Sequence, residues 1–206
     1  MISKNHRVWL LTAILAGAAI QACATNIVSD PSFSSGTPDS YTGAMGDGWV
    51  VTAGTGAICN DITLAGCGSA GSAYIGDQMA FLDWSDTLDT TTQTLTTFIG
   101  QNYTISYWVA GSAANFLEVT FGGSTLFNGT APTGGVASPS DYVEYTFNAT
   151  ATSTSTVLAF SGQRTVSGEI LLGDVSVTAI PEPAPWLLTA VPLLGLGALR
   201  FKLRRG

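Results

Sequence analysis

The sequence has little positive charge and few of the side chains that enzymes use as nucleophiles or bases. Its one histidine is His6, and between Thr25 and Ile180 it has one basic residue, Arg164, against thirteen carboxylates. Such an acidic surface repels phosphate backbones, which argues against nucleic-acid binding. A region without lysine or histidine cannot assemble a Ser-His-Asp triad, a Schiff-base lysine or a histidine-built zinc site. A carboxylate pair of the glycosidase kind remains available, but no spacing selects two carboxylates, so we interpret the chain as non-enzymatic.

Cysteine is also scarce, with three residues in the chain. A predicted signal peptide determines which of them remain after export. Residues 1–24 have the charged start, apolar stretch and small-residue cleavage site of a secretory signal peptide, and cleavage after Ala24 removes Cys23. A lipidated Cys23 is the alternative, although Gln21 fits that motif poorly. The remaining pair, Cys59 and Cys67, is expected to form a disulfide in an oxidising compartment, the alternative being two free thiols.

The C-terminal segment predicts a membrane anchor. No charge occurs in the 17 residues from Pro183 to Leu199. A helix over about residues 185–200 would nearly cross the hydrocarbon core, and the basic residues beyond it would stay on the cytoplasmic side. Because basic residues also precede the first apolar segment, residues 25–180 are expected to face outside. The alternative is a buried core helix, which fits poorly with the basic terminus.

The same segment carries a recognisable order of parts. Pro181, Glu182 and Pro183 precede the apolar span, and Arg204 and Arg205 follow it. This order closely resembles the PEP-CTERM sorting signal of Gram-negative bacteria, here residues 180–206. The resemblance implies processing by an exosortase, with the protein anchored in the inner membrane and then passed to the cell surface or the extracellular polysaccharide matrix.

Residues 25–179 show the period-two alternation of half-buried strands and no helical periodicity of useful length. We therefore expect an all-β domain, an antiparallel β-sandwich of jelly-roll type, with a hairpin turn at Gly122-Gly123 and a loop over residues 34–48. The predicted strands are Asn26–Ser29, Trp49–Ala53, Ser72–Ile75, Gln78–Leu82, Thr91–Thr97, Tyr103–Val109, Leu117–Phe121, Leu126–Phe127, Val143–Ala149, Thr156–Ser161 and Leu171–Val177.

The likeness extends to carbohydrate-binding modules. The segments that carry it are Asn26-Ile27-Val28 with Phe33, Gly48-Trp49, Gly100 to Trp108, and Gly173 to Val177. These resemble jelly-roll domains often found ahead of this sorting signal. The resemblance implies a structural calcium ion with Asp174 as a ligand. Ser34 and Gly173 depart from the acidic residues common in such sites, and a solvated Asp174 is the alternative.

Two tryptophans are candidate glycan-binding residues. Trp108 falls on the polar face of its strand, and Trp84 lies near a predicted loop. An exposed indole ring is a platform for a sugar ring, whereas the alternative is a Trp covered by a crossing loop. The nearby carboxylates Asp83, Asp86 and Asp89 would suit a calcium loop or, more simply, a solvated turn.

We therefore expect an exported surface or matrix protein that binds or organises extracellular polysaccharide without catalysis. Its expected partners are an exosortase, a polysaccharide and, before processing, the membrane. The alternatives are a polysaccharide-acting enzyme and a purely structural surface protein.

Overall fold

The computed structural model describes residues 24–35, 39–46, 48–59, 79–82, 88–111, 114–135, 138–165 and 170–181. All its regular elements are strands, apart from one 3₁₀ turn, η1, at Pro139–Asp141. The strands are β1 Asp39–Gly46, β2 Trp49–Cys59, β3 Met79–Leu82, β4 Asp89–Thr96, β5 Asn102–Gly111, β6 Phe116–Phe121, β7 Ser124–Thr130, β8 Val143–Thr150, β9 Ser155–Gln163 and β10 Ile170–Ala179.

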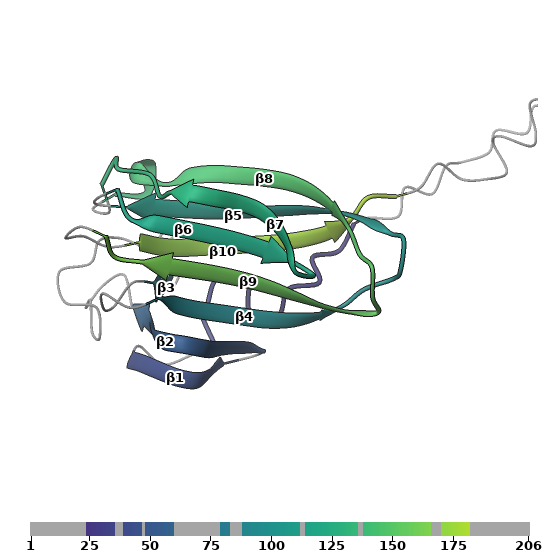
Figure 1. The fold of residues 1–206 in the computed structure, drawn as a ribbon, viewed down its shortest axis with the longest axis horizontal. Coiled ribbons are helices and arrows are strands. Elements are labelled where there is room, and N and C mark those ends of the chain that lie inside the picture. Colours follow the sequence, from purple (N-terminus) through teal and green to yellow (C-terminus); the bar gives the residue numbers. More distant parts are fainter. Residues whose placement is uncertain are drawn as a thin grey trace, which may run out of the picture.

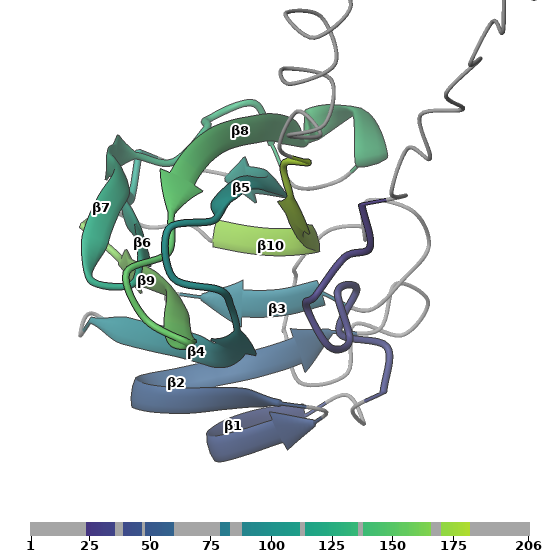
Figure 2. The same ribbon diagram turned by 90° about the vertical axis from the view of Figure 1, so that its right-hand side faces the viewer.

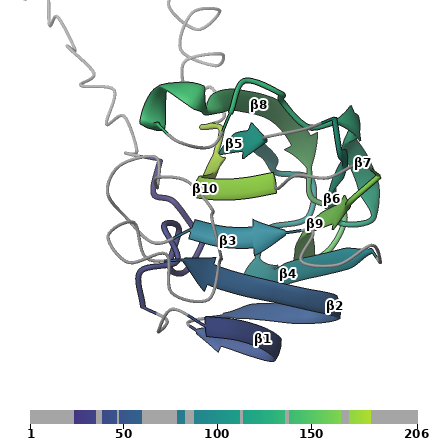
Figure 3. The same ribbon diagram turned by 90° about the vertical axis from the view of Figure 1, so that its left-hand side faces the viewer.

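The strands form two facing antiparallel layers that are joined along one side. One layer has the order β7-β6-β9-β4-β2, with β1 also pairing β2, and the other has the order β3-β10-β5-β8. The β2–β3 pairing links the layers into one rolled sheet, which Figure 1 shows from the side and Figures 2 and 3 show from its two ends. The predicted all-β antiparallel fold is confirmed.

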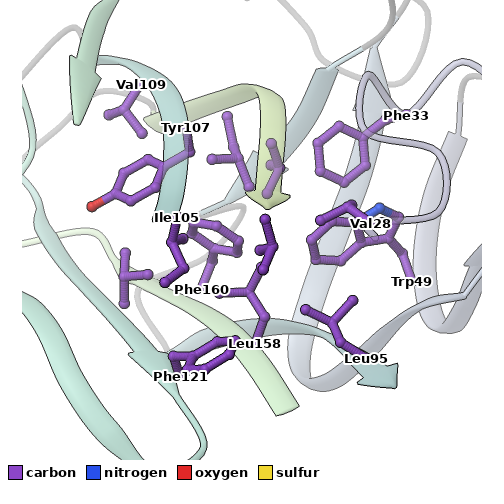
Figure 4. Close-up of a cluster of buried hydrophobic side chains, with 14 of the residues drawn as sticks. Val28, Phe33, Trp49, Leu95, Ile105, Tyr107, Val109, Phe121, Leu158 and Phe160 are labelled. Carbon is purple, nitrogen blue, oxygen red and sulfur yellow. The ribbon is translucent and has the colours of Figure 1, made fainter. Parts of the chain in front are cut away.

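The core lies between the layers. Tyr103, Ile105, Tyr107 and Val109 alternate along β5 and are buried, as the sequence predicted. Ile105, Tyr107 and Val109 lie with Leu158 and Phe160 of β9 in the core between the layers (Figure 4). Since every second side chain of each strand points inward, the intervening positions form the outer faces of the two layers.

Residues 24–35, the segment before β1, cover the side of the rolled sheet between β10 and β4. Ile27 N donates to Val177 O at 2.9 Å and Val175 N donates to Pro31 O at 2.9 Å. Its Phe33 ring is fully buried and packs 4.9 Å, between ring centroids, from Trp49. The strand predicted over Asn26–Ser29 is reduced to one bridge, Asn26 with Thr178, because side-chain contacts hold much of this segment.

Two predictions about the strands were wrong in detail. The segment 34–48, predicted as a loop, contains β1. This strand pairs with β2 through two irregular registers, and its Gly43 has a φ of +97°. A bulged, glycine-containing edge strand lacks side-chain alternation, so its pattern resembles that of a loop.

The second error concerns β10. The sequence placed Leu171, Val175 and Val177 on one face. A bulge between Gly173 and Ser176 inserts one residue relative to β5. The inward residue before the bulge is therefore Leu172, paired with Val109, and Leu171 lies on the opposite face. One inserted residue reverses the face of every position beyond it.

The Gly122-Gly123 turn is confirmed, with φ values of +59° and +79°. Several other predictions fall outside the described residues: the signal peptide, the strand at 72–75, Trp84, Cys67, and the tail from Glu182 through Pro183 to Arg204 and Arg205. Cys59 ends β2, but its side chain is not described, so the disulfide stays a prediction. Within the described ranges, no helix has the length and apolar character needed to cross a membrane.

Candidate functional site

Trp108 lies on the outer face of the β3-β10-β5-β8 layer and is half-buried. Its neighbours in register are Gly173 on β10 and Glu144 on β8. Directly opposed side chains on adjacent strands lie about 5 Å apart at Cβ. Gly173 has no side chain, so of these two register neighbours it is Glu144, which is exposed, that places a side chain beside the indole.

The next row along the same face consists of three hydroxyl residues. Ser176 pairs with Ser106, and Ser106 pairs with Thr146. In the described part of the chain, none of these three hydroxyls has a protein hydrogen-bond partner. Beyond them, Thr104 Oγ1 donates to Asn148 Oδ1 at 3.1 Å, so that row is already paired.

We call Trp108, Glu144, Ser106, Thr146 and Ser176 the Trp108 face. It combines one half-buried aromatic ring, one exposed carboxylate and three hydroxyls. Aromatic rings stack on the apolar side of a sugar, and hydroxyl and carboxylate groups pair with its hydroxyls. The geometry therefore suits an exposed glycan chain that lies across β10, β5 and β8.

Asp174 occupies the bulge of β10 between the Trp108 row and the hydroxyl row. It is half-buried, and its φ of +44° is unusual for a residue with a side chain. Asp30 and Phe33, at +47° and +60°, also have positive φ. All three lie where the segment before β1 meets β10, since Val175 N bonds to Pro31 O. The meeting of the first and last segments agrees with the sequence expectation.

The calcium site expected at Asp174 stays a prediction, and the carboxylate of Asp30 on the facing segment is bonded within its own turn. The Asp30 carboxylate accepts hydrogen bonds from the backbone N–H groups of Ser34 and Ser35, at 2.8 and 3.3 Å, and from both hydroxyls. It is therefore already satisfied by protein donors. No group of three metal-ligating side chains occurs within the described ranges. Ser34, which stands where the resemblance to carbohydrate-binding modules leads us to expect an acidic residue, donates to Asp30 through its backbone N–H and its hydroxyl.

Among the described residues, Glu144 and Glu118 on the two outer faces do not form a glycosidase pair. Glu144 lies on the outer face of β8, whereas Glu118 lies on the outer face of β6 in the other layer and accepts a bond from Asn128 Nδ2 at 3.1 Å. The core separates the two groups. A retaining or inverting pair requires carboxylates within about 5–10 Å on either side of one bond.

Two buried polar residues were not identified from the sequence. Asp89 was interpreted as part of a solvated turn, yet it is fully buried and its Oδ1 accepts from Thr55 N at 2.7 Å. Gln93 bonds to both backbone groups of Ser29. Both residues lie on the inward face of β4. The sequence signal for this was their spacing, because Asp89, Thr91, Gln93 and Leu95 occupy every second position and therefore share one face.

Comparisons with known proteins show only distant likeness. No protein-family model and no curated protein matches the chain. Among solved structures, a CBM61 module in complex with β-1,4-galactotriose shares 11% identity and has a TM-score of 0.49, with 76% of this chain and 99% of that chain covered. The CBM22-1 xylan-binding domain from Paenibacillus barcinonensis Xyn10C shares 18% identity, with a TM-score of 0.48 and coverage of 78% and 97%.

The active domain of tailspike protein 4 of bacteriophage CBA120 shares 14% identity, with a TM-score of 0.47. The match covers 75% of this chain but only 21% of the tailspike domain. With TM-scores below 0.5, these likenesses do not identify a function, so the functional argument is based on the surface of the chain itself.

Proposed function

We propose that this chain is an exported, non-catalytic surface protein that binds extracellular polysaccharide through the Trp108 face. The observation that carries the proposal is the half-buried indole of Trp108 beside three unpaired hydroxyls and the exposed Glu144. The outer face has no basic side chain in its described rows. It therefore favours neutral or amino-bearing glycans over uronate or sulfate polymers.

Affinity electrophoresis of the full chain in gels containing neutral, amino-bearing and uronate polysaccharides tests this proposal. Trp108→Ala is expected to weaken binding at least about fivefold, because a central aromatic contact is worth more than about 1 kcal/mol. Ser106→Ala is expected to have a smaller effect. Thr94→Ala removes an exposed hydroxyl from the outer face of the other layer and serves as the matched control.

If the chain binds no polysaccharide in any gel, it is better described as a purely structural surface protein. If it shortens the polymer, and Glu144→Gln abolishes that turnover, the polysaccharide-acting enzyme is the correct alternative. Equal binding by the Trp108→Ala variant and the unsubstituted chain would place the glycan site elsewhere.

We also propose that residues 180–206 anchor the exported domain in the inner membrane until an exosortase processes it near Pro181-Glu182-Pro183. Pro181, the last described residue, is exposed. The first and last described segments pair at Asn26 and Thr178, so the two ends of the domain lie side by side (Figure 1). Such an arrangement suits a domain whose two flanking segments both begin at one membrane.

Cell fractionation tests the anchoring. Tripeptide variants such as Glu182→Ala are expected to stay in the membrane fraction, while the unsubstituted chain passes to the surface or the medium. Protection of residues 25–180 from protease added to intact spheroplasts would overturn the proposed export.

A further inference from the structure

The end of the domain at which the described chain reaches Pro181 has no charged side chain in its described loops, and Glu182 follows in the sequence. This end is formed by the loops 97–101, 122–123 and 151–154 and by Ile180 and Pro181, none of which contains Asp, Glu, Lys or Arg. Backbone bonds hold the first and third loops together, with Gly100 N donating to Ala151 O at 2.8 Å. Figure 2 looks directly onto this end. In a domain with thirteen carboxylates, such a surface is unusual.

The same end exposes two adjacent apolar side chains. Phe98 and Ile99, in the loop between β4 and β5, are 74% and 69% exposed, more than any other large apolar residue described. Phe98 N donates to the Tyr103 hydroxyl at 3.0 Å, which fixes the backbone of the loop while its side chains point outward. The exposure of this pair is therefore a feature of an ordered turn.

This loop lies next to Ile180, one residue before the end of the described chain. Gln101 Nε2 donates to Ile180 O at 2.7 Å, and Ile180 N donates to Asn102 O at 2.8 Å. The uncharged run begins at Pro183, two residues beyond Pro181. Two or three residues span at most about 10 Å, so an anchored tail would hold this end of the domain against the bilayer surface.

We propose that the loop 97–101 inserts Phe98 and Ile99 into the lipid headgroup region while the tail is anchored. Apolar side chains gain by leaving water at the interface, and the loops 97–101, 122–123 and 151–154 carry no carboxylate that anionic headgroups would repel. The domain would then stand with this end on the membrane and its strands pointing away from it. The inference rests on the proposed membrane anchor and adds a second contact to it.

Fluorescence quenching by lipids with nitroxide-labelled acyl chains tests this contact. The full chain, in a Trp9→Phe background, is reconstituted into nanodiscs with and without labelled lipid. Trp186 of the tail reports whether the anchor is embedded. Phe98→Trp and Ile99→Trp are expected to add a fluorescence component that labelled lipid quenches at least twofold. Val143→Trp is the matched control, since Val143 is 45% exposed but begins β8 at the opposite end of the domain.

Quenching of Trp186 without extra quenching at either loop position would overturn the loop contact and leave the anchor standing. Absence of quenching at Trp186 would overturn both. Equal quenching at the loop positions and at Val143 would also contradict the proposal, because it would indicate contact without a preferred end.

Discussion

Gln93 of β4 holds both backbone groups of Ser29. Its Oε1 accepts from Ser29 N at 2.8 Å and its Nε2 donates to Ser29 O at 2.8 Å, while the Gln93 side chain is only 2% exposed. This pair ties the segment before β1 to the centre of one layer. The same segment bonds to β10 of the other layer through Ile27 and Val175. Gln93 therefore helps to hold the two layers together.

Replacing Gln93 by leucine keeps the side-chain volume and removes both bonds. We expect the free energy of unfolding to fall by about 2 kcal/mol, because two backbone groups lose partners in a partly buried place. Urea denaturation measures the loss, and hydrogen exchange should show faster exchange of the Ile27 amide. Thr94→Ala, on the exposed face of the same strand, should change neither quantity. A Gln93→Leu variant with unchanged Ile27 exchange would show that the bonds to β10 and the packing of Phe33 hold this segment without Gln93.

Gly54 has a φ of +64°, and a Cβ added there would overlap Asp89 Oδ1. Gly123 has a φ of +79° with open space around it. Gly123→Ala is expected to cost about 1–2 kcal/mol through backbone strain alone. Gly54→Ala is expected to cost at least about 2 kcal/mol more, because the buried carboxylate must move. If thermal denaturation shows equal losses of stability for the two variants, the Asp89 side chain moves aside at little energetic cost.

The Tyr107 hydroxyl is buried without a hydrogen-bond partner among the described residues, whereas the Tyr103 hydroxyl accepts from Phe98 N. Removing an unsatisfied buried hydroxyl should stabilise the fold, and removing a bonded one should not. We therefore expect Tyr107→Phe to raise the free energy of unfolding by about 1 kcal/mol at neutral pH and Tyr103→Phe to lower it by a similar amount. The opposite order in urea denaturation would contradict the described hydrogen bonding.

Burial raises the pKa of Tyr107, and the neighbouring Tyr145 raises it further. An unfolded tyrosine ionises near pH 10. Above that pH the unfolded chain loses the Tyr107 proton while the folded chain keeps it. The stability is thus complete below about pH 10 and falls above it, by at most about 1.4 kcal/mol per pH unit from this residue. The fall should be shallower in Tyr107→Phe, and parallel stability curves for the two proteins would contradict the shift.

Measuring the Tm with a chelator and with added calcium tests whether the domain binds a calcium ion through Asp174. Because the Asp30 carboxylate is filled by donors from Ser34 and Ser35, we expect chelator and added calcium to leave the Tm unchanged. Asp174→Asn should likewise show no calcium dependence. A Tm that rises with calcium and loses that rise in Asp174→Asn would restore the site suggested by the resemblance to carbohydrate-binding modules.

The placement of Trp108 was predictable because alternation along a regular strand assigns each side chain to a face. The same rule failed at β10, where one residue inserted by the bulge moved Leu171 to the other face. It also failed at β1, whose glycine-containing, irregular pairing leaves no alternating pattern. The alternation of side chains thus identified most strands. It was inaccurate at bulges, because a bulge depends on backbone geometry and not on the alternation of apolar and polar residues.

The sequence alone determined the all-β class, the acidic region 25–180 without histidine or lysine, and the candidate ring at Trp108. These follow from side-chain chemistry and from the period of two along each strand. Only the tertiary structure decided that Gly173 and Glu144 flank Trp108, that Gln93 holds Ser29, and that the loop of Phe98 and Ile99 lies beside Ile180. Such relationships join residues far apart in the chain. They depend on strand order and register, which hydrogen bonding between strands sets and a single strand does not encode.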